Sequence, residues 1–444
     1  MFLFYSCFIF IYYMFFFNSN PKEKIKFYLL AVILSCFTSN LYAQQDTILN
    51  RSNFPNSFAS DSAVIAFLSD AGIPITTDNK VRLLKNGNEK FDDLFNTIEK
   101  AKHHIHLEYF NFRNDSIAKE LFTRLTHKAQ EGIEVRALFD AFGNWSNSRP
   151  LKKKHLKKLR EKGIEIYHFD PLYFPYINHV FHRDHRKIAV IDGATAYVGG
   201  MNIADYYIKG LPEIGAWRDM HIRIDGSAAY YLQEIFLSMW NKSTKQNING
   251  KEYFPIKPNT RDGKTIAIID RTPKKSPKLM RRTYAKSIDA AQSKIQIVNP
   301  YFLPTRSVRK ALKSALKRGI DVEIMISAKA DIAFTPEGSI RVAHNLMKKG
   351  AHIYLYEGGF HHSKIMMIDD SFCTVGTTNL DSRSLRYDYE VNAFIFDKET
   401  TDELTEIFEK DKTSSTILTP NEWKKRSVWK RFVGMLAQMC TPFL

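Results

Sequence analysis

The chain has 444 residues, which is too long for one ordinary hydrophobic core and suits two domains of ordinary size. Because 44% of the residues are hydrophobic and 25% are charged, the composition excludes an intrinsically disordered protein. Lys and Arg exceed Asp and Glu by 17 (64 against 47), which favours a polyanionic partner, either nucleic acid or an anionic membrane. The four cysteines indicate neither a disulfide framework nor a paired-cysteine zinc site.

The first 43 residues are expected to be a signal peptide or a membrane segment. Residues 27–37 form an apolar core of 11 residues with three lysines before it, which suits a signal peptide cleaved after Ala43, and Met14 is then a possible start. A pair of membrane helices is the alternative, because residues 1–17 are also apolar. In both hypotheses the rest of the chain is exported, because the three lysines before residues 27–37 would stay in the cytoplasm. The sequence around Cys36 also loosely resembles a lipoprotein site.

The body of the chain is a repeat. After a polar lead-in (44–78), the sequence predicts a first domain over 79–248, a second over 249–420 and a basic tail over 421–444. In both halves, strand-like runs alternate with helical patterns, as in AKHHIHLEYF against AQSKIQIVNP and EGIEVR against RGIDVE. This order predicts an α/β protein in which each half has a mixed, mostly parallel sheet flanked by helices.

One polar pattern occurs in both halves with identical spacing. The first copy consists of His185, Lys187, Asp192 and Asn202, with Gly199-Gly200 before the asparagine. The second copy consists of His362, Lys364, Asp369 and Asn379, with Gly376-Thr377 in the same place. In the first copy, residues 187–191 and 195–198 are strand-like runs joined through Asp192-Gly193, which predicts a hairpin. We therefore expect Asp192 and Asp369, which complete the pattern at strand ends, to be structural.

The two copies predict one site for a phosphodiester. Residues two apart on a strand face the same side, so each His projects together with its Lys. One histidine can attack phosphorus while the other protonates the leaving oxygen and then activates an acceptor hydroxyl. The lysines, with Asn202 and Asn379, would bind and stabilise the phosphoryl group without a metal or any other cofactor.

Each catalytic imidazole needs a partner on its other nitrogen, and a carboxylate serves well. Downstream of each pattern lies one candidate, Asp219 in Trp217-Arg218-Asp219 and Glu390 after Tyr389. We expect Asp219 to orient His185 from its own half, and Glu390 to do the same in the second half.

These residues resemble the phospholipase D superfamily, whose duplicated His-Lys-Asp motifs form one site between two α/β domains. The blocks HRKIAVIDG, YVGGMNIAD, WRDMHIRIDG, NPYFLP and TTNLDSRSL resemble its bacterial cardiolipin synthase branch, from about Gly72 to Leu444. The resemblance implies transfer of a phosphatidyl group from one phosphatidylglycerol to another through a phosphohistidine, with His185 as nucleophile and His362 as acid and base. Asp388, where relatives often have Asn, departs from the pattern.

Two other activities remain open: hydrolysis of phospholipids in the manner of phospholipase D, and a metal-independent nuclease prompted by the net charge. A scaffold that keeps the motifs without catalysis is a third possibility. His179, His182 and His185 recur every third residue, which raises a metal site as an alternative. The export signal and the apolar tail favour lipid over nucleic acid.

Several other segments can have a structural or a functional role. The histidines at 103, 104 and 106 are expected to be structural, and Glu108 to border the site. The basic run 151–162 is most simply a solvated helix face, and the aromatic insertion within 167–184 either touches lipid or packs on the other domain. In the tail, apolar residues recur at helical spacing beside basic ones, which predicts a helix that lies on an anionic membrane or packs on the domains.

Overall fold

The computed structural model describes residues 60–173, 181–255, 263–329 and 335–439. The predicted signal or membrane segment, most of the lead-in, His179 and part of the aromatic insertion lie outside these residues. Among the helices that are described, none combines the length and the apolar character needed to cross a membrane.

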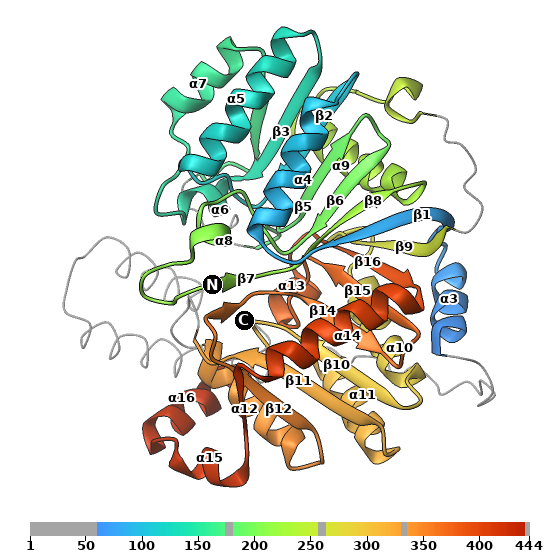
Figure 1. Cartoon of the computed structure of the whole chain (residues 1–444), viewed down its shortest axis with the longest axis vertical. Helices are drawn as coiled ribbons and strands as arrows, with labels where there is room; N and C mark the ends of the chain where they lie inside the picture. The colour runs from blue at the N-terminus through green and yellow to red at the C-terminus, as the bar shows by residue number, and fades with distance from the viewer. Residues whose placement is uncertain (1–59, 174–180, 256–262, 330–334, 440–444) are drawn as a thin grey trace.

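From Ser60, where the described residues begin, the first half has helix α3 and then alternates strands and helices as predicted (Figure 1). Its elements are α3 (Ser60–Asp70), β1 (Ile75–Leu84), α4 (Gly87–Glu99), β2 (His104–Tyr109), α5 (Ser116–Gln130), β3 (Glu134–Asp140), α6 (Ala141–Trp145), α7 (Lys153–Glu161), β4 (Glu165–Phe169), β5 (Lys187–Ile191), β6 (Thr195–Gly199), α8 (Tyr206–Lys209), β7 (Trp217–Arg218), β8 (His221–Asp225), α9 (Ala228–Thr244) and the short η3 (Lys251–Tyr253).

The second half repeats this order and ends in two tail helices. Its elements are β9 (Lys264–Arg271), α10 (Leu279–Ala290), β10 (Lys294–Val298), α11 (Arg306–Lys317), β11 (Asp321–Ser327), α12 (Thr335–Met347), β12 (His352–Tyr356), β13 (Phe360–His361), β14 (Ile365–Ile368), β15 (Phe372–Gly376), α13 (Ser382–Arg386), β16 (Glu390–Phe396), α14 (Lys398–Lys412), β17 (Ser415–Ile417), α15 (Pro420–Lys425) and α16 (Val428–Met439).

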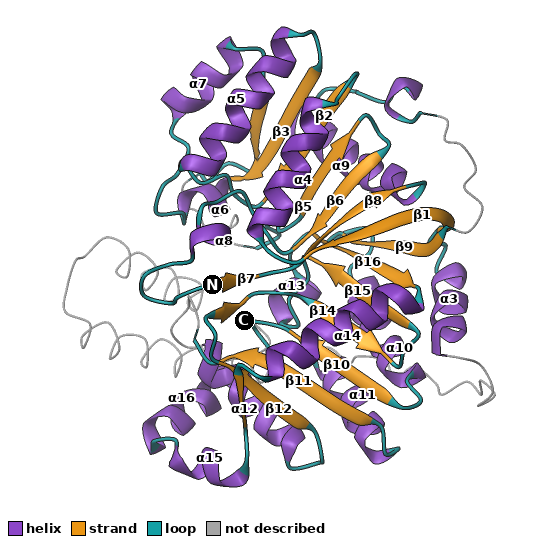
Figure 2. Ribbon diagram, in the orientation of Figure 1, coloured by secondary structure: helices purple, strands orange, loops and turns teal. Residues whose placement is uncertain are grey.

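The two sheets are joined into one. Its strand order is β17-β12-β11-β10-β14-β15-β16-β9-β1-β8-β6-β5-β2-β3-β4, and β1 pairs antiparallel with β9 at the junction between the halves (Figure 2). The predicted boundary between 78 and 79 falls inside β1, which pairs with a strand of each half. The exact domain limits therefore stay a prediction.

The α/β class, the repeat and the mixed sheet are confirmed, but the parallel share is smaller than predicted. Within this sheet the parallel pairs are β2–β3 and β3–β4 in the first half, and β10–β11 and β11–β12 in the second. Helices α5, α6 and α7 connect the parallel strands of the first half and α11 and α12 those of the second, whereas the other neighbouring strands of this sheet are antiparallel.

Helices cover both faces of the sheet, and clusters of buried apolar residues lie between the helices and each face. In the first half α4 and α5 pack on one face through buried residues such as Phe91 and Leu121, and the corresponding core of the second half lies under α10, α11 and α12. On the opposite face one cluster runs through both halves, from Leu232 of α9 to Phe408 of α14. This shared core fixes the halves relative to each other.

The predicted hairpin is present in both halves, and its aspartate anchors it. Asp192 and Asp369 have positive φ angles of 53° and 51°, as a tight hairpin turn requires. The carboxylate of Asp192 accepts hydrogen bonds from the backbone N–H groups of residues 102–104, and Asp369 accepts them from residues 292–294. Both aspartates lie at the ends of β5 and β14 that are far from the histidines, which agrees with a structural role.

The tail helix α16 packs on α12 with one face and leaves the other exposed. A Cβ added at Gly434 would lie 2.6 Å from the carbonyl oxygen of Glu337, so the two helices approach closely there. Val428, Trp429 and Met439 are 73%, 51% and 56% exposed, respectively, and Lys424, Lys425 and Lys430 are exposed nearby. The predicted packing on the domains is therefore observed, and the alternative, contact with an anionic membrane, stays a prediction that the exposed apolar side chains leave open.

Candidate active site

The two pattern segments meet through short parallel backbone pairings between the halves. β13, just before His362, pairs in parallel with β7, and the N–H of His362 donates to the carbonyl of Arg218 at 2.7 Å. In the other direction, Asp184 forms a parallel bridge with Tyr389, and the N–H of His185 donates to the carbonyl of Tyr389 at 3.0 Å. The same arrangement thus occurs twice, related by the repeat.

The histidines and their carboxylates are paired across the halves. Nδ1 of His185 donates to Oε1 of Glu390 at 2.9 Å, and Nδ1 of His362 donates to Oδ2 of Asp219 at 2.6 Å. Our expectation that Asp219 would orient His185 from its own half is therefore wrong. The backbone pairings explain this, because Asp219 directly follows Arg218 and Glu390 directly follows Tyr389.

These bonds fix which nitrogen of each ring faces the site. Because a carboxylate can only accept, Nδ1 carries the hydrogen and Nε2 of a neutral ring keeps its lone pair. For His185, burial and the positive charges of Lys187 and Lys364 hold the pKa well below its usual range. A neutral imidazole with a free electron pair on Nε2 is the form that a nucleophile needs.

Both motif lysines are buried and fold back in the same way. Nζ of Lys187 donates to the carbonyl of His185 at 2.6 Å, and Nζ of Lys364 donates to the carbonyl of His362. Burial, together with the charge of Lys364, lowers the pKa of Lys187 to about 7. Burial raises the pKa of Glu390 to about 7, against the charge of Lys187, which lowers it. Lys187 and Glu390 therefore both titrate near neutral pH.

The two asparagines are each 5% exposed and follow the strands that pair with the histidine strands. The side chain of Asn202 is held by two long contacts: the backbone N–H of Asn111 donates to its Oδ1 at 3.4 Å, and its Nδ2 donates to the hydroxyl of Tyr207 at 3.4 Å. Oδ1 of Asn379 is buried without a partner in the described residues. Their role in binding phosphate stays a prediction.

Sequence reasoning missed an asymmetry in the glycine pairs before these asparagines. The hydroxyl of Thr377 donates to Oε2 of Glu390, the carboxylate oxygen that does not face His185. In the first half the same position is Gly200, where an added Cβ would lie 2.1 Å from Oδ1 of Asp219. The longer Glu390 therefore leaves room for a threonine, whereas the shorter Asp219 needs a glycine behind it. The two pairs have identical spacing in the sequence, and from this spacing the equivalence of Gly200 and Thr377 could have been recognised.

Lys90 was also missed, because it lies in helix α4 outside any motif. Its side chain is fully buried, and Nζ donates to the carbonyl of Asn202 at 3.0 Å. Burial holds the pKa of Lys90 well below its usual range, and the charge of Lys187 acts in the same direction. Lys90 thus supports the segment that carries Asn202.

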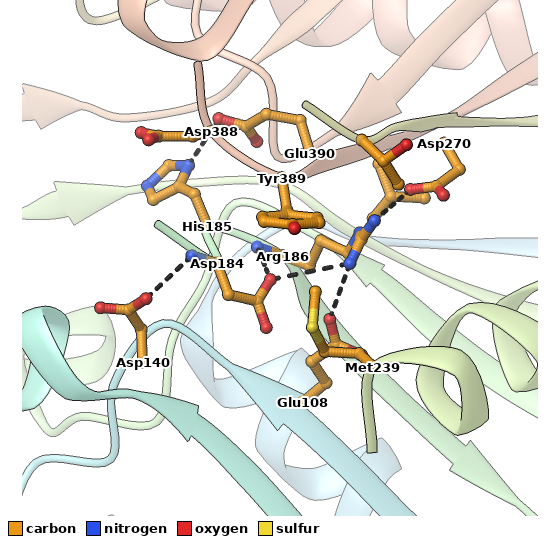
Figure 3. A network of polar contacts seen from close by, with 12 residues as sticks. Glu108, Asp140, Asp184, His185, Arg186, Met239, Asp270, Asp388, Tyr389 and Glu390 are labelled. Carbon is orange, nitrogen blue, oxygen red and sulfur yellow. Dashed lines mark hydrogen bonds and ion pairs between the residues drawn. The ribbon is translucent and has the colours of Figure 1, made fainter. Parts of the chain in front are cut away.

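The neighbours of His185 in the chain, Asp184 and Arg186, belong to a network of charged groups (Figure 3). Arg186 forms ion pairs with Glu108 at 3.2 Å and with Asp270, which belongs to the second half. Asp140 accepts from the backbone N–H of Asp184 at 2.8 Å. The network, which includes Glu108, therefore secures the segment from which His185 projects, and a place of Glu108 at the border of the site stays a prediction.

Other described histidines that the sequence singled out make contacts with residues outside the two histidine–carboxylate pairs. His104 and His106 pack against each other and against Tyr253 on the far side of the sheet. Nδ1 of His182 lies 2.9 Å from the carbonyl of Tyr387. Asp388, the departure from the family pattern, pairs with Arg383 at 2.8 Å and accepts from the N–H of Arg183.

Comparisons with known proteins agree with this architecture. A family model described as "Cardiolipin synthase, PLD-like domain" matches residues 94–240 and 284–412. A cardiolipin synthase of Listeria monocytogenes serotype 4b (strain CLIP80459) is 38% identical over 396 residues, which cover 88% of this chain and 80% of the relative. Cardiolipin synthase 2 of Staphylococcus epidermidis (strain ATCC 35984) is 39% identical over 375 residues, which cover 83% and 75%.

Among solved structures, the phosphatidylserine synthase of Haemophilus influenzae Rd KW20 has a TM-score of 0.66 at 15% identity. The match covers 86% of this chain and 99% of that one, and at such low identity it shows the fold alone. Two phospholipase D-like halves that build one composite site define the class. Within that class, the chain belongs to the family of cardiolipin synthases with phospholipase D-like domains, and the resemblance seen in the motifs is confirmed.

The Gly200 and Thr377 positions provide a test of how the carboxylates are held. Gly200→Ala should displace Asp219 and lower kcat for phospholipid turnover about 10–100-fold with little change in KM. Thr377→Val should have a similar effect by removing the bond to Glu390. Thr377→Ser keeps the hydroxyl and is the matched control. Equal activity of the Val and Ser variants would contradict the assigned role of Thr377.

The pKa values near 7 predict a bell-shaped pH dependence of kcat/KM. The ammonium of Lys187 is present below its pKa of about 7, so binding of phosphate should weaken as the pH rises through that value. The carboxylate of Glu390 is present above its pKa of about 7, so kcat/KM should also fall at lower pH.

The variant Lys187→Arg distinguishes the alkaline limb of this pH profile from the acidic limb, because a guanidinium stays charged where the lysine loses its proton. Its maximum should be lower, since an arginine fits the buried site poorly, but the alkaline limb should move to higher pH. Lys313→Arg, at an exposed position, should leave the profile as it is. An alkaline limb that is identical in Lys187→Arg and the unchanged protein would contradict the assignment.

Proposed function

We propose that this protein is a cardiolipin synthase that joins two molecules of phosphatidylglycerol into cardiolipin and glycerol. The observation that carries the proposal is the pair of motif histidines, each held by a carboxylate of the other half, in a chain of this family. The listerial and staphylococcal relatives are named for the same reaction.

The first half-reaction forms a covalent intermediate. Nε2 of His185 attacks the phosphorus of one phosphatidylglycerol, a P–N bond forms, and the bond from phosphorus to the glycerol oxygen breaks. His362, in its protonated form, gives the Nε2 proton to that oxygen, so glycerol leaves. Asp219 supports the positive ring at 2.6 Å, and Lys187 and Lys364 stabilise the charge on the phosphoryl oxygens.

The second half-reaction reverses these roles. His362, now neutral, takes the proton from the hydroxyl of a second phosphatidylglycerol, and the oxygen attacks phosphorus. The P–N bond breaks, so cardiolipin is released, and both histidines return to their starting forms. Glu390 keeps the hydrogen of His185 on Nδ1 throughout, and no metal or other cofactor takes part in these steps.

The substrate places the enzyme at a membrane, and the tail offers a surface for that contact. Val428, Met435 and Met439 recur on one face of α16 and are exposed, with Lys424, Lys425 and Lys430 beside them. The N-terminal apolar stretches and their lysines support a cell-envelope enzyme whose two halves act on the exported side. Nucleic acid is disfavoured as a partner by the same features.

The products formed from phosphatidylglycerol vesicles test the proposal. Incubation with the full chain, followed by mass analysis of the lipids, should give cardiolipin and glycerol in equal amounts in the presence of a chelator. His185→Gln and His362→Gln should each reduce the rate about 10³-fold or more. His352→Gln is the matched control, because that side chain is 61% exposed on the surface.

Formation of phosphatidic acid without cardiolipin would contradict the proposal and would show that the protein hydrolyses phospholipids. Degradation of DNA under the same conditions, with no lipid product, would favour the nuclease. Full activity of the two glutamine variants would show that the pattern is not catalytic.

A further inference from the structure

The repeat allows the surroundings of the two histidines to be compared position by position. The N–H of Arg113 donates to the carbonyl of Ile203, and the N–H of Leu303 donates to the carbonyl of Leu380 in the same way. These bonds set Asn111 of the first half equivalent to Tyr301 of the second. The backbone pairings at the histidines likewise set Arg183 equivalent to Phe360, and Asp388 equivalent to Trp217.

Around His362 all three of these positions are aromatic. The ring centroids of Trp217 and Phe360 each lie 5.4 Å from that of His362, and the centroid of Tyr301 lies 6.3 Å away. Tyr301 and Phe360 belong to the second half but pack into the apolar core of the first. The His362 side chain is only 9% exposed behind these rings.

Around His185 the equivalent positions are polar. Asp388, Arg183 and Asn111 take the places of the three rings, and Asp388 and Arg183 are both held in ionic contacts. The aromatic neighbour of this histidine is Phe110, at 5.2 Å between centroids. The side chain of His185 is 16% exposed. Two nearly symmetric imidazoles thus sit in unlike environments, one apolar and one ionic.

We propose that the wall formed by Trp217, Tyr301 and Phe360 decides between transfer and hydrolysis by keeping water away from Nε2 of His362. The inference rests on the proposed function, in which His362 activates the acceptor. A water molecule needs two to four polar partners to remain at a buried position. Phe360 offers none, and the wall's polar atoms are the indole N–H of Trp217, which is buried without a partner in the described residues, and the hydroxyl of Tyr301. The acceptor hydroxyl of phosphatidylglycerol is held in place by the rest of the lipid molecule and does not need such polar partners.

The competing reactions differ only in the attacking oxygen. In transfer, the hydroxyl oxygen of phosphatidylglycerol bonds to phosphorus, its proton goes to His362, and the P–N bond to His185 breaks. In hydrolysis, water supplies both the oxygen and the proton, and phosphatidic acid leaves in place of cardiolipin. The product ratio therefore reports access of water at this step, while a loss of folded enzyme lowers both products together.

The test replaces an aromatic residue of the wall by the polar residue of the other half. Tyr301→Asn introduces the side chain found at Asn111, and Trp217→Gln is a second, independent opening of the wall. Tyr301→Phe keeps the ring and is the matched control. Phosphatidylglycerol vesicles are the substrate, in water enriched in oxygen-18, so that hydrolysis marks phosphatidic acid with one heavy oxygen.

Each opening should raise the ratio of labelled phosphatidic acid to cardiolipin by about tenfold, the factor that corresponds to about 1.4 kcal/mol. Tyr301→Phe should keep the ratio of the unchanged protein. If both openings lower the two products in parallel and leave their ratio unchanged, the inference is overturned while the proposed function stands. If the unchanged protein makes no cardiolipin, the proposed function fails and this inference fails with it.

Discussion

The short parallel backbone pairings between the halves are the constraint on which the site depends. They place the segment before each histidine beside the segment that carries the carboxylate of the other half. Neither half alone then holds a complete pair of imidazole and carboxylate. The pairing of β1 with β9 and the apolar core that runs from α9 to α14 hold the halves in the required register. The fold therefore positions the chemistry by joining two copies of one domain.

Symmetry of the backbone does not extend to the side chains. The shorter Asp219 is accommodated by Gly200, and the longer Glu390 is held by Thr377. His362 lies among three rings, while His185 lies among charged groups and feels the positive charges of Lys187 and Lys364. Such differences allow two similar imidazoles to do different work, one as a neutral nucleophile and one as an acid and base. The repeat supplies the geometry, and the departures from it supply the division of roles.

Much of this architecture could be predicted from the sequence, because its signals are local. The spacing from His185 to Asn202 repeats from His362 to Asn379, and Asp192-Gly193 marks a hairpin that the structure contains. The crossed pairing could not be predicted, since spacing along the chain places Asp219 after its own motif but not beside a particular histidine. Lys90 carries no local signal in α4, where it is distinguished only by burial against the backbone of Asn202. The smaller parallel share of the sheet follows from strand pairings that hydrophobic patterns do not specify.

The central claim is that each histidine is held by the carboxylate of the other half, and the Nδ1–H protons report this directly. In the full chain labelled with nitrogen-15 in histidine, the signals of His185 and His362 can be assigned with single glutamine variants. Replacement of Asp219 by Asn should change the strongly hydrogen-bonded Nδ1–H signal of His362 and leave that of His185 in place. Loss of the His185 signal, with that of His362 unchanged, would contradict the crossed pairing and the composite site built on it.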